Sequence, residues 1–367
     1  MTDSVQNSPA AGAAADLAPP DSADHADGTD STPAWSSPSA RLALASLQTR
    51  AWELSRLAEE TAEALARAGT PQSDGFTDIA RRSIPRWHFP MLNDTERNEA
   101  LALALHKQIP SGSLVLEIGT GTGFLAMAAV KAGAGHVVTC EENPLMAEIA
   151  RQTIARHGMS DAVTVVPRRS TALSVGGELP RRADVLISEI VDCGLVGEGL
   201  FPAVRHAREH LLAPGGLMLP AGAQLHGQLI ESAAVAGLNR VRSAADYDVS
   251  LMNTVATPGH FPVRLNTWPH RTLSQRAPLA RWDLRAAPLL PGSRRVSLPV
   301  TDGGRADGLV VWFALDYGEG IVLGNEPEKT ASHWSQALVP LDGSAVLRPG
   351  GLFDLELSWS DSRLTAR

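Results

Sequence analysis

Two glutamates, Glu189 and Glu198, stand nine residues apart, and two glycines, Gly194 and Gly197, lie between them. A loop of this kind can turn both carboxylates toward one point. Two neighbouring carboxylates repel each other unless they share a proton or a cation. A planar guanidinium, with five N–H donors in a fixed fork, is the natural cation for such a pair. The spacing therefore favours a guanidinium site, and the alternative is two unrelated surface acids.

A glycine-rich segment, residues 114–123, gives a second chemical signal. An apolar run containing Glu117 leads into Gly119, Gly121 and Gly123. A strand, a tight glycine turn and a helix N-terminus form a cradle for a nucleotide-like cofactor, because side chains there would block the ligand's approach to the backbone. The spacing G-x-G-x-G differs from the G-x-G-x-x-G of dehydrogenases. It suits S-adenosylmethionine, which has an amino-acid end but no pyrophosphate; the alternative is a glycine turn without a ligand.

Two later apolar runs end in acidic residues. Residues 136–140 precede Glu141, which can accept hydrogen bonds from ribose hydroxyls at the end of a second strand. Residues 183–188 precede Glu189, at the sheet edge where open α/β folds place ligands. Residues 211–220 then predict a helix end, a Pro-Gly-Gly turn and a strand. This order of elements resembles the core of a class I methyltransferase.

The sequence predicts an α/β fold in which a Rossmann-like class I methyltransferase domain follows N-terminal helices and precedes a β-barrel or β-sandwich domain. We expect residues 1–40 to be a disordered acidic tail, residues 77–220 to bind S-adenosylmethionine, and residues 221–367 to form the β domain. The strands expected in the cofactor domain lie near 114–118, 136–140, 163–166, 184–188 and 216–219. The β-rich runs that indicate the second domain include 224–231, 309–315 and 353–359.

Residues 41–76 form a predicted helical arm that ends near Gly69 and Pro71. Apolar residues recur along it at spacings of three, four or seven: Leu44, Leu47, Ala51, Leu54, Ala58 and Leu65. Such a stripe packs either on the chain's own core or on a second copy of the chain. The second possibility predicts a homodimer.

Most of the net charge of -8 lies in the first 40 residues, which contain six aspartates and neither lysine nor arginine. The rest is near neutral, so we expect no binding to nucleic acid, which needs a basic face. We find no apolar run long enough to span a bilayer and no secretory leader, and therefore expect no membrane partner. The two cysteines, Cys140 and Cys193, suit a reducing compartment. These features predict a cytoplasmic enzyme.

One pattern competes with this interpretation. His206-Ala-Arg-Glu-His210 fits H-x-x-E-H, a zinc-binding pattern whose two histidines would share one face of a helix. No third ligand is apparent in the sequence. We therefore expect no metal.

Several segments together resemble the protein arginine methyltransferases, and most closely their monomethylating, type III branch. Residues 91–98 resemble the family's M-L-x-D-x-x-R-N motif, and residues 331–334 resemble its Thr-His-Trp loop. The glycine turn, the loop with two glutamates, and residues 202–212 and 228–232 also match. Single-module relatives of this kind include the arginine N-methyltransferases of streptozotocin-type nitrosourea biosynthesis.

The resemblance implies roles for individual residues. Arg97 would bind the carboxylate of S-adenosylmethionine, and Glu141 its ribose hydroxyls. Glu189 and Glu198 would clamp the substrate guanidinium, in a site walled by His333 and Trp334. The residues expected at the cofactor are Arg97, Glu117, Gly119, Gly121, Gly123, Glu141, Ser170 and Thr171.

The chain departs from the family pattern around both sites. Ala172 stands where the family usually has an acid that helps to hold adenine. Gly194 stands where type III enzymes carry a glutamate inside the loop, although Asp192 remains. No tyrosine precedes Tyr247, so an aromatic hydroxyl near the N-terminal motif is missing.

The implied chemistry is an in-line displacement that the protein orients. The guanidinium is protonated and delocalised, and two carboxylates can polarise it and hold one nitrogen toward the methyl group. A base is needed when the product loses its extra proton. The candidates are Glu198, Asp192 and His333, which the sequence does not rank.

Three functions remain open. The favoured one is methylation of free L-arginine at its internal Nδ nitrogen, in the biosynthesis of a nitrosourea-type antibiotic metabolite. The second is monomethylation of arginine within proteins. The third is a pseudo-methyltransferase that binds partners through the acidic tail. The first is favoured because the chain has one module where type III enzymes usually have two, and because the departures flank the arginine pocket.

Overall fold

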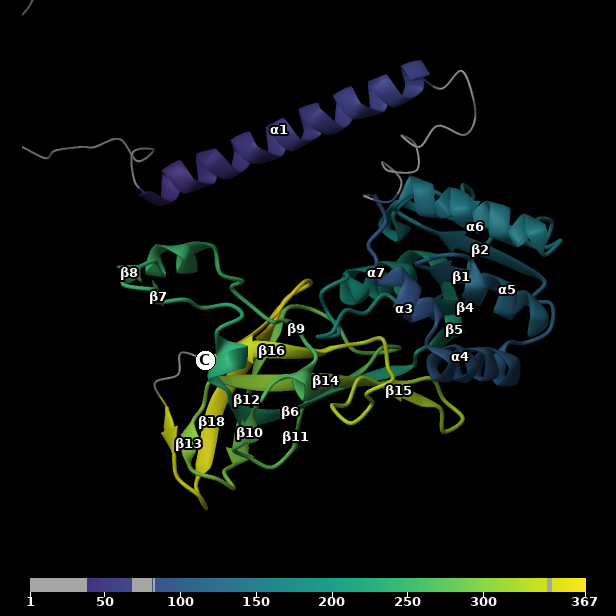
Figure 1. The fold of residues 1–367 in the computed structure, drawn as a ribbon. Helices are drawn as coiled ribbons and strands as arrows, with labels where there is room; N and C mark the ends of the chain where they lie inside the picture. The colour runs from purple at the N-terminus through teal and green to yellow at the C-terminus, as the bar shows by residue number, and fades with distance from the viewer. Residues whose placement is uncertain (1–37, 68–80, 82, 342–344) are drawn as a thin grey trace, which may run out of the picture. The chain divides into compact units, whose positions relative to one another are not determined.

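A computed structural model describes residues 38–67, 81, 83–341 and 345–367 of the 367-residue chain. The chain divides into two compact units, residues 1–79 and 80–367. The described part of the first unit is one helix, α1 (Pro38–Arg67) (Figure 1). Proline suits the first helical turn, and Arg56 pairs with Glu60 one turn later. The arm expected over 41–76 is therefore helical where it is described, whereas the expected tail up to residue 37 lies outside the described residues.

The second unit contains a five-stranded parallel sheet in the order β3-β2-β1-β4-β5. Its central strand β1 is buried at all five positions, as a strand covered on both faces must be. The strands are β1 (Leu114–Ile118), β2 (His136–Cys140), β3 (Val163–Val166), β4 (Ala183–Ser188) and β5 (Leu212–Leu219). The α/β class and the Rossmann-like order predicted from the sequence are confirmed.

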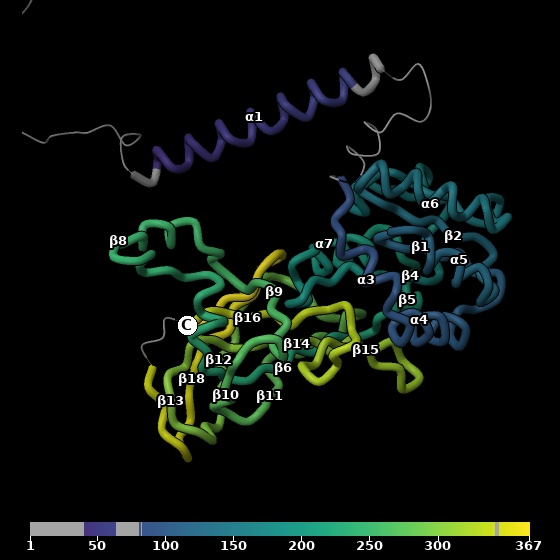
Figure 2. Tube along the Cα trace, viewed as in Figure 1, coloured from purple at the N-terminus to yellow at the C-terminus, as the bar shows by residue number. Residues whose placement is uncertain are grey.

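Helices connect and cover this sheet. Asn143 caps α6 by accepting from the Leu145 and Met146 N–H groups, and Pro144 occupies its first position. The helices and helical turns of this domain are α3 (His88–Leu92), α4 (Thr95–Gln108), α5 (Phe124–Lys131), α6 (Pro144–Arg156), η2 (Ser170–Ala172), α7 (Leu200–His206) and η3 (Ala207–Leu211). The β domain contains α8 (Ala233–Ala236), η4 (Ser250–Val255) and η5 (Leu265–Thr267). The tube in Figure 2 follows α4, α5 and α6 around the sheet.

Strand β5 differs from its prediction. The expected Pro-Gly-Gly turn lies inside β5, which starts at Leu212, directly after the π-helical turn η3. The pairing with β4 shifts register between Ala183 and Val185, and this irregularity accommodates the extra residues. The glycines therefore form a bulged strand edge and not a turn between helix and strand.

The β domain consists of two main antiparallel sheets. The larger runs β10-β6-β14-β16-β9, with β11 on β6 and β15 on β14; the smaller runs β12-β18-β19. Their strands are β6 (Gly222–Glu231), β9 (Phe261–Val263), β10 (Arg271–Thr272), β11 (Ala277–Asp283), β12 (Gly292–Pro299), β14 (Gly308–Asp316), β15 (Val322–Gly324), β16 (Gln336–Pro340), β18 (Leu352–Trp359) and β19 (Leu364–Ala366). Two short pairs join β7 (Ser243–Ala244) with β8 (Tyr247–Asp248), and β13 (Gly304–Arg305) with β17 (Val346–Leu347).

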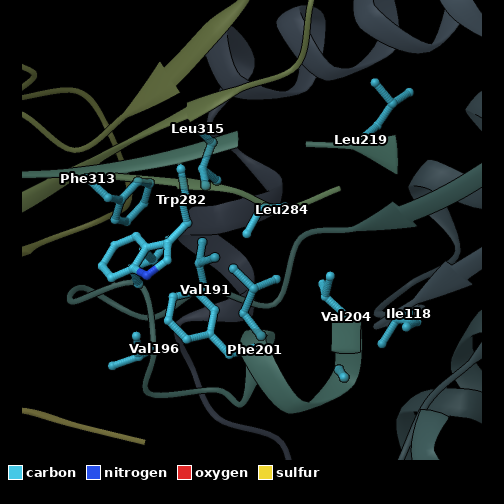
Figure 3. Packing of buried hydrophobic residues seen from close by; sticks show 14 of the residues in the cluster. Ile118, Val191, Val196, Phe201, Val204, Leu219, Trp282, Leu284, Phe313 and Leu315 are labelled. Atoms are coloured by element: carbon cyan, nitrogen blue, oxygen red, sulfur yellow. The ribbon is translucent and has the colours of Figure 1, made fainter. Parts of the chain in front are cut away.

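One apolar core joins the two domains. Phe201 of α7 meets Trp282 of β11 with ring centroids 5.0 Å apart. Val191 and Val196, from the loop after β4, lie in the same core as Trp282 and Phe313 of the β domain, as Figure 3 shows. The loop that carries Glu189 and Glu198 is therefore held between the domains by buried apolar contacts.

No helix among the described residues is long and apolar enough to cross a membrane.

Candidate active site

A cavity of about 880 Å³ opens at the carboxyl edge of the parallel sheet. Its wall comes from α3, the turn after β1, the loop after β4 and the turn between β18 and β19. The predicted site residues that line it are Arg97, Glu117, Gly119, Gly121, Glu141, Ser170, Thr171, Glu189 and Glu198. Gly123, Asp192, His333 and Trp334 lie behind this wall. The two predicted groups, one for the cofactor and one for the guanidinium, therefore meet at one cavity.

The glycine turn has the geometry of a ligand cradle. Gly119, Gly121 and Gly123 have φ values of 90°, 51° and 87°, in the left-handed region that favours glycine. A Cβ on Gly119 would lie 2.5 Å from Cγ2 of Ile190. Gly123, the N-cap residue of α5, packs on Ile154 of α6 and does not line the cavity. The cavity-facing glycines therefore let a ligand approach the backbone closely, although the Gly119 N–H already donates to the Cys140 carbonyl and the Gly121 N–H to Glu141.

Two acids beside the turn fit the polar ends of S-adenosylmethionine. Glu141 accepts from the Gly121 N–H (3.1 Å) and the Asn143 N–H (3.0 Å), which fixes it at the end of β2. Glu117 is 1% exposed and accepts from the Thr139 hydroxyl (2.6 Å), and its Oε1 has no partner. Burial raises the pKa of Glu117 to about 8. An ammonium group would satisfy this orphaned oxygen, and the amino-acid end of the cofactor carries one.

Arg97 and Glu189 form a buried ion pair. Both side chains are almost fully buried, and Nη2 of Arg97 donates to Oε2 of Glu189. Nη1 donates to Asn98 (2.7 Å), whereas the buried Nε has no partner. Asp94 accepts from the Arg97 N–H and so caps the helix that presents this guanidinium. The unpaired Nε–H is a donor that a carboxylate in the cavity could use.

Glu198 is the second carboxylate of the pair. Glu198 is an exposed residue on the cavity wall, and neighbouring side chains enclose much of its carboxylate. The pKa of Glu198 is raised to about 7, mainly because its carboxylate is desolvated and secondly because Glu189, Asp192 and Glu141 carry like charges nearby. Burial also raises the pKa of Glu189, while Arg97 opposes that rise. Because Glu189 is already paired with Arg97, the carboxylate that holds a proton readily in the absence of substrate is Glu198.

Asp192 stabilises the loop itself. Its Oδ1 accepts from the N–H groups of Gly194 (3.1 Å) and Gly197 (2.8 Å). Its Oδ2 lies 2.5 Å from Nε2 of His260, whose Nδ1 accepts from the Leu364 N–H (2.9 Å). The proton of this imidazole is therefore on Nε2, where it donates to Asp192. Asp192 faces His260, and the structure does not place it on the cavity wall.

His260 also accounts for the glycine at position 194. A Cβ on Gly194 would lie 2.6 Å from the His260 ring. The imidazole thus fills the space that a larger side chain would need. The departure from the type III pattern at this position is coupled to a histidine more than sixty residues further along the chain.

His333 and Trp334 stand behind Arg97. The Asp94 carboxylate accepts from the backbone N–H of His333 and lies 2.9 Å from its Nδ1. Burial lowers the pKa of His333 to about 4. The Trp334 ring lies 5.6 Å from Cζ of Arg97. Both residues support Arg97, and neither lines the cavity.

Several supporting residues were not identified from the sequence. Asp94 belongs to a quoted motif, and its place before a helix was the available signal for a cap. His260 and Asn325 had no local signal; Asn325 donates to the carbonyls of Cys193 and Ser335 and ties the loop to the β domain. Asp361 and Ser362, on the cavity wall, come from the last turn of the chain.

The two histidines of the zinc pattern gain no third ligand among the residues that the structure describes. His206 and His210 have ring centroids 4.8 Å apart, but His210 is exposed. Among the residues that the structure describes, the group with metal-ligand spacing is Asp192, Cys193 and His260. Both nitrogens of His260 are engaged there in the hydrogen bonds given above.

Comparisons with known proteins show which family the chain resembles. A family model described as Ribosomal protein L11 methyltransferase (PrmA) matches residues 100–217. An arginine N(omega)-methyltransferase of Streptomyces achromogenes subsp. streptozoticus is 56% identical over 327 residues, covering 88% of this chain and 91% of that protein. Protein arginine N-methyltransferase 9 of Mus musculus is 29% identical, and this chain spans 38% of its length.

A solved structure has the same fold. The Trypanosoma brucei PRMT1 enzyme-prozyme complex with AdoHcy matches with a TM-score of 0.64 and 22% identity, covering 74% of this chain and 86% of that one. With the 56% identity to the Streptomyces protein, the chain belongs to the arginine methyltransferase family of S-adenosylmethionine-dependent enzymes.

Proposed function

We propose that this enzyme methylates free L-arginine, with Glu189 and Glu198 as the clamp for the guanidinium. The observation that carries the proposal is the meeting of these two carboxylates with the glycine turn at one cavity. A guanidinium placed there would take the place of the proton that Glu198 otherwise retains beside the Arg97–Glu189 pair.

The cofactor, when bound, supplies a methyl group already activated on a sulfonium. The residues proposed to hold it are Arg97, Glu117 and Glu141, with the backbone of Gly119 and Gly121. Nε of Arg97 is free to donate to a carboxylate, and Oε1 of Glu117 is free to accept from an ammonium. Ser170 and Thr171 line the same wall on the next turn of chain, where Ala172 contributes no acid.

The clamp is proposed to do three things. It binds the guanidinium, holds one nitrogen toward the methyl group, and polarises the cation without taking its proton first. After transfer, the product sheds a proton that has become acidic. Glu198 is the proposed acceptor, because Asp192 is engaged by His260 and His333 by Asp94.

Free arginine is preferred to protein arginine for two reasons. The Streptomyces relative, at 56% identity, is named an arginine methyltransferase and not a protein arginine methyltransferase. The protein arginine N-methyltransferase 9 of Mus musculus is only 29% identical. In addition, the last turn of the chain contributes Asp361 and Ser362 to the cavity wall, beside the loop that carries the clamp.

We propose the terminal ω nitrogen as the methyl acceptor, in place of the internal Nδ expected from the sequence. The Streptomyces relative is named an N(omega)-methyltransferase. A terminal nitrogen carries a single carbon neighbour and is less hindered than Nδ, which carries two. The methylated arginine would then serve nitrosourea-type specialised metabolism, in keeping with the organism of that relative.

Calorimetry tests the substrate. In the presence of the demethylated cofactor, L-arginine should bind with one site per chain, and E198Q should weaken that binding. An arginine-containing peptide with blocked termini should bind more weakly than L-arginine. Tighter binding of the peptide would favour the protein-directed alternative.

A further inference from the structure

We infer that Asp361 binds the α-ammonium group of the substrate and thereby selects a free amino acid. This inference rests on the proposed function and names the residue that recognises the end of the substrate opposite the guanidinium.

Asp361 lies in the turn that joins β18 to β19. The turn is well defined, because the Ser360 hydroxyl accepts from the N–H groups of Ser362 and Arg363, and the Ser360 N–H donates to the Arg363 carbonyl. Both Asp361 and Ser362 line the cavity. A carboxylate is therefore held on the cavity wall by an ordered turn.

The two oxygens of Asp361 differ. Oδ2 lies 3.6 Å from Nη2 of Arg205 on α7, whose Nη1 donates to the Leu289 carbonyl (2.6 Å). Oδ1 is buried and has no hydrogen-bond partner. Arg205 thus orients the carboxylate and leaves one acceptor unsatisfied. An ionised carboxylate can only accept, so the missing partner is an N–H or O–H donor.

Hydrogen bonds and chain connectivity link this turn to the loop that carries the clamp. It is tied to the clamp loop through His260, which receives the Leu364 N–H at Nδ1 and donates from Nε2 to Asp192. Arg205 belongs to α7, the helix that begins two residues after Glu198. Both connections run to the segment that carries the guanidinium clamp, and neither runs to the glycine turn.

An α-ammonium fits this position better than the other groups of the two ligands. The guanidinium has Glu189 and Glu198, and the ammonium of the cofactor has Glu117 beside the glycine turn. The sulfonium has no hydrogen to donate, so the α-ammonium of L-arginine is the remaining cation with N–H donors, and Asp361 is a carboxylate with a vacant acceptor. An arginine inside a peptide has an amide in place of this cation, so the same contact would favour the free amino acid.

The test compares two substrates with the D361N variant. L-Arginine has the α-ammonium, whereas 5-guanidinopentanoate keeps the guanidinium and carboxylate and lacks the amine. D361N should raise KM for L-arginine by about 10- to 100-fold, the loss expected for one charge-assisted hydrogen bond. Its KM for 5-guanidinopentanoate, its kcat, and its affinity for the demethylated cofactor should stay within a few-fold of wild type.

The matched control is D354N, because Asp354 lies in β18, the strand before the turn, accepts from the Ser297 hydroxyl and does not line the cavity. It should behave as wild type with both substrates. Cofactor calorimetry verifies that each variant is folded, and D361A repeats the comparison without an amide donor. Equal changes for both substrates, or none for either, would overturn the role of Asp361. A wild-type enzyme that methylates a peptide and not L-arginine would instead overturn the proposed function.

Discussion

Arg97 and Glu189 form a buried ion pair that joins the proposed cofactor site to the proposed arginine clamp. From the sequence we expected Arg97 to bind the cofactor and Glu189 to bind the substrate. In the structure the two side chains bind each other. Glu189 thus holds the donor expected to meet the cofactor carboxylate, while Glu198 stands in the cavity without an arginine partner among the described residues. The two binding sites share a residue contact, and this contact distinguishes the two glutamates.

The pair predicts different outcomes for two similar variants. E189Q and E198Q should each remove nearly all methyl transfer, because an amide lacks the charge and one of the acceptors that the guanidinium needs. E189Q should also weaken cofactor binding by about 10-fold or more, since it removes the charge that positions Arg97. E198Q should leave cofactor affinity within a few-fold. Calorimetry with the demethylated cofactor measures this difference, and equal affinities in both variants would show that the ion pair does not couple the sites.

The raised pKa of Glu198 predicts a pH dependence of turnover. Below about 7 this carboxyl is protonated in the free enzyme and no longer balances the guanidinium. The value of kcat/KM for L-arginine should therefore fall as pH drops below about 7, approaching about ten-fold per pH unit. A profile from roughly pH 5.5 to 9 measures it. A flat profile across pH 7 would mean that Glu198 stays ionised in the free enzyme.

Glu117 predicts a pH dependence of stability. Its pKa rises from 4.5 to about 8 on folding, so its favourable contribution is complete below about 4.5 and is lost as pH rises through about 8. E117Q lacks this titration. Relative to wild type without cofactor, its free energy of unfolding should increase between pH 5 and pH 8.5 by an amount on the order of a few kcal/mol. Urea unfolding at both pH values measures this; parallel curves for the two proteins would contradict a neutral buried Glu117.

The same substitution should weaken the binding of the cofactor. E117Q replaces an acceptor that has no partner in the structure with an amide that carries no charge. The affinity for S-adenosylmethionine should drop by about 10-fold or more, as for other charge-assisted contacts to an ammonium. Calorimetry at pH 8.5 provides the measurement, and unchanged affinity would place the ammonium elsewhere.

Helix α1 is predicted to support a homodimer. Leu44, Leu47 and Leu54 are exposed on it, and an apolar stripe of this kind needs a partner. The side chain of Leu65, at the end of the stripe, lies outside the described ones. Deleting residues 1–70 should yield a monomer by light scattering. L47E with L54E should do the same, whereas T49E, on the opposite side of the helix, should not; an unchanged dimer in the deletion would show that other surfaces hold it together.

The parts of the site that could be predicted were those encoded in short segments. The glycine turn, Glu141 and the two loop glutamates follow strands whose apolar patterns are continuous, so their place at the sheet edge follows from the fold class. The strands β1, β2 and β3 have the bounds expected from these patterns. The Pro-Gly-Gly turn expected before the last strand was the exception, because the register shift that places these residues inside β5 depends on the pairing with β4.

The parts that could not be predicted come from contacts between distant segments. The need for glycine at position 194 cannot be read from the neighbouring sequence, because it comes from the His260 ring that fills the space beside it. The Asp361 turn follows a strand in the β domain, and no local pattern links it to the cofactor domain. The Arg97–Glu189 pair spans 92 residues and depends on where α4 meets the sheet edge. Such contacts arise from tertiary packing, which periodicity and motif spacing do not encode.

The central claim is that this enzyme places a methyl group on an ω nitrogen of free L-arginine. The direct measurement supplies S-adenosylmethionine with a ¹³C-labelled methyl group, ¹⁵N-labelled L-arginine and an equal amount of an arginine-rich peptide in one reaction, and locates the label by NMR and mass spectrometry. We predict a single new methyl signal on an ω nitrogen of free arginine, an unmodified peptide, and no signal with E198Q. Label in the peptide with free arginine unchanged would contradict the account.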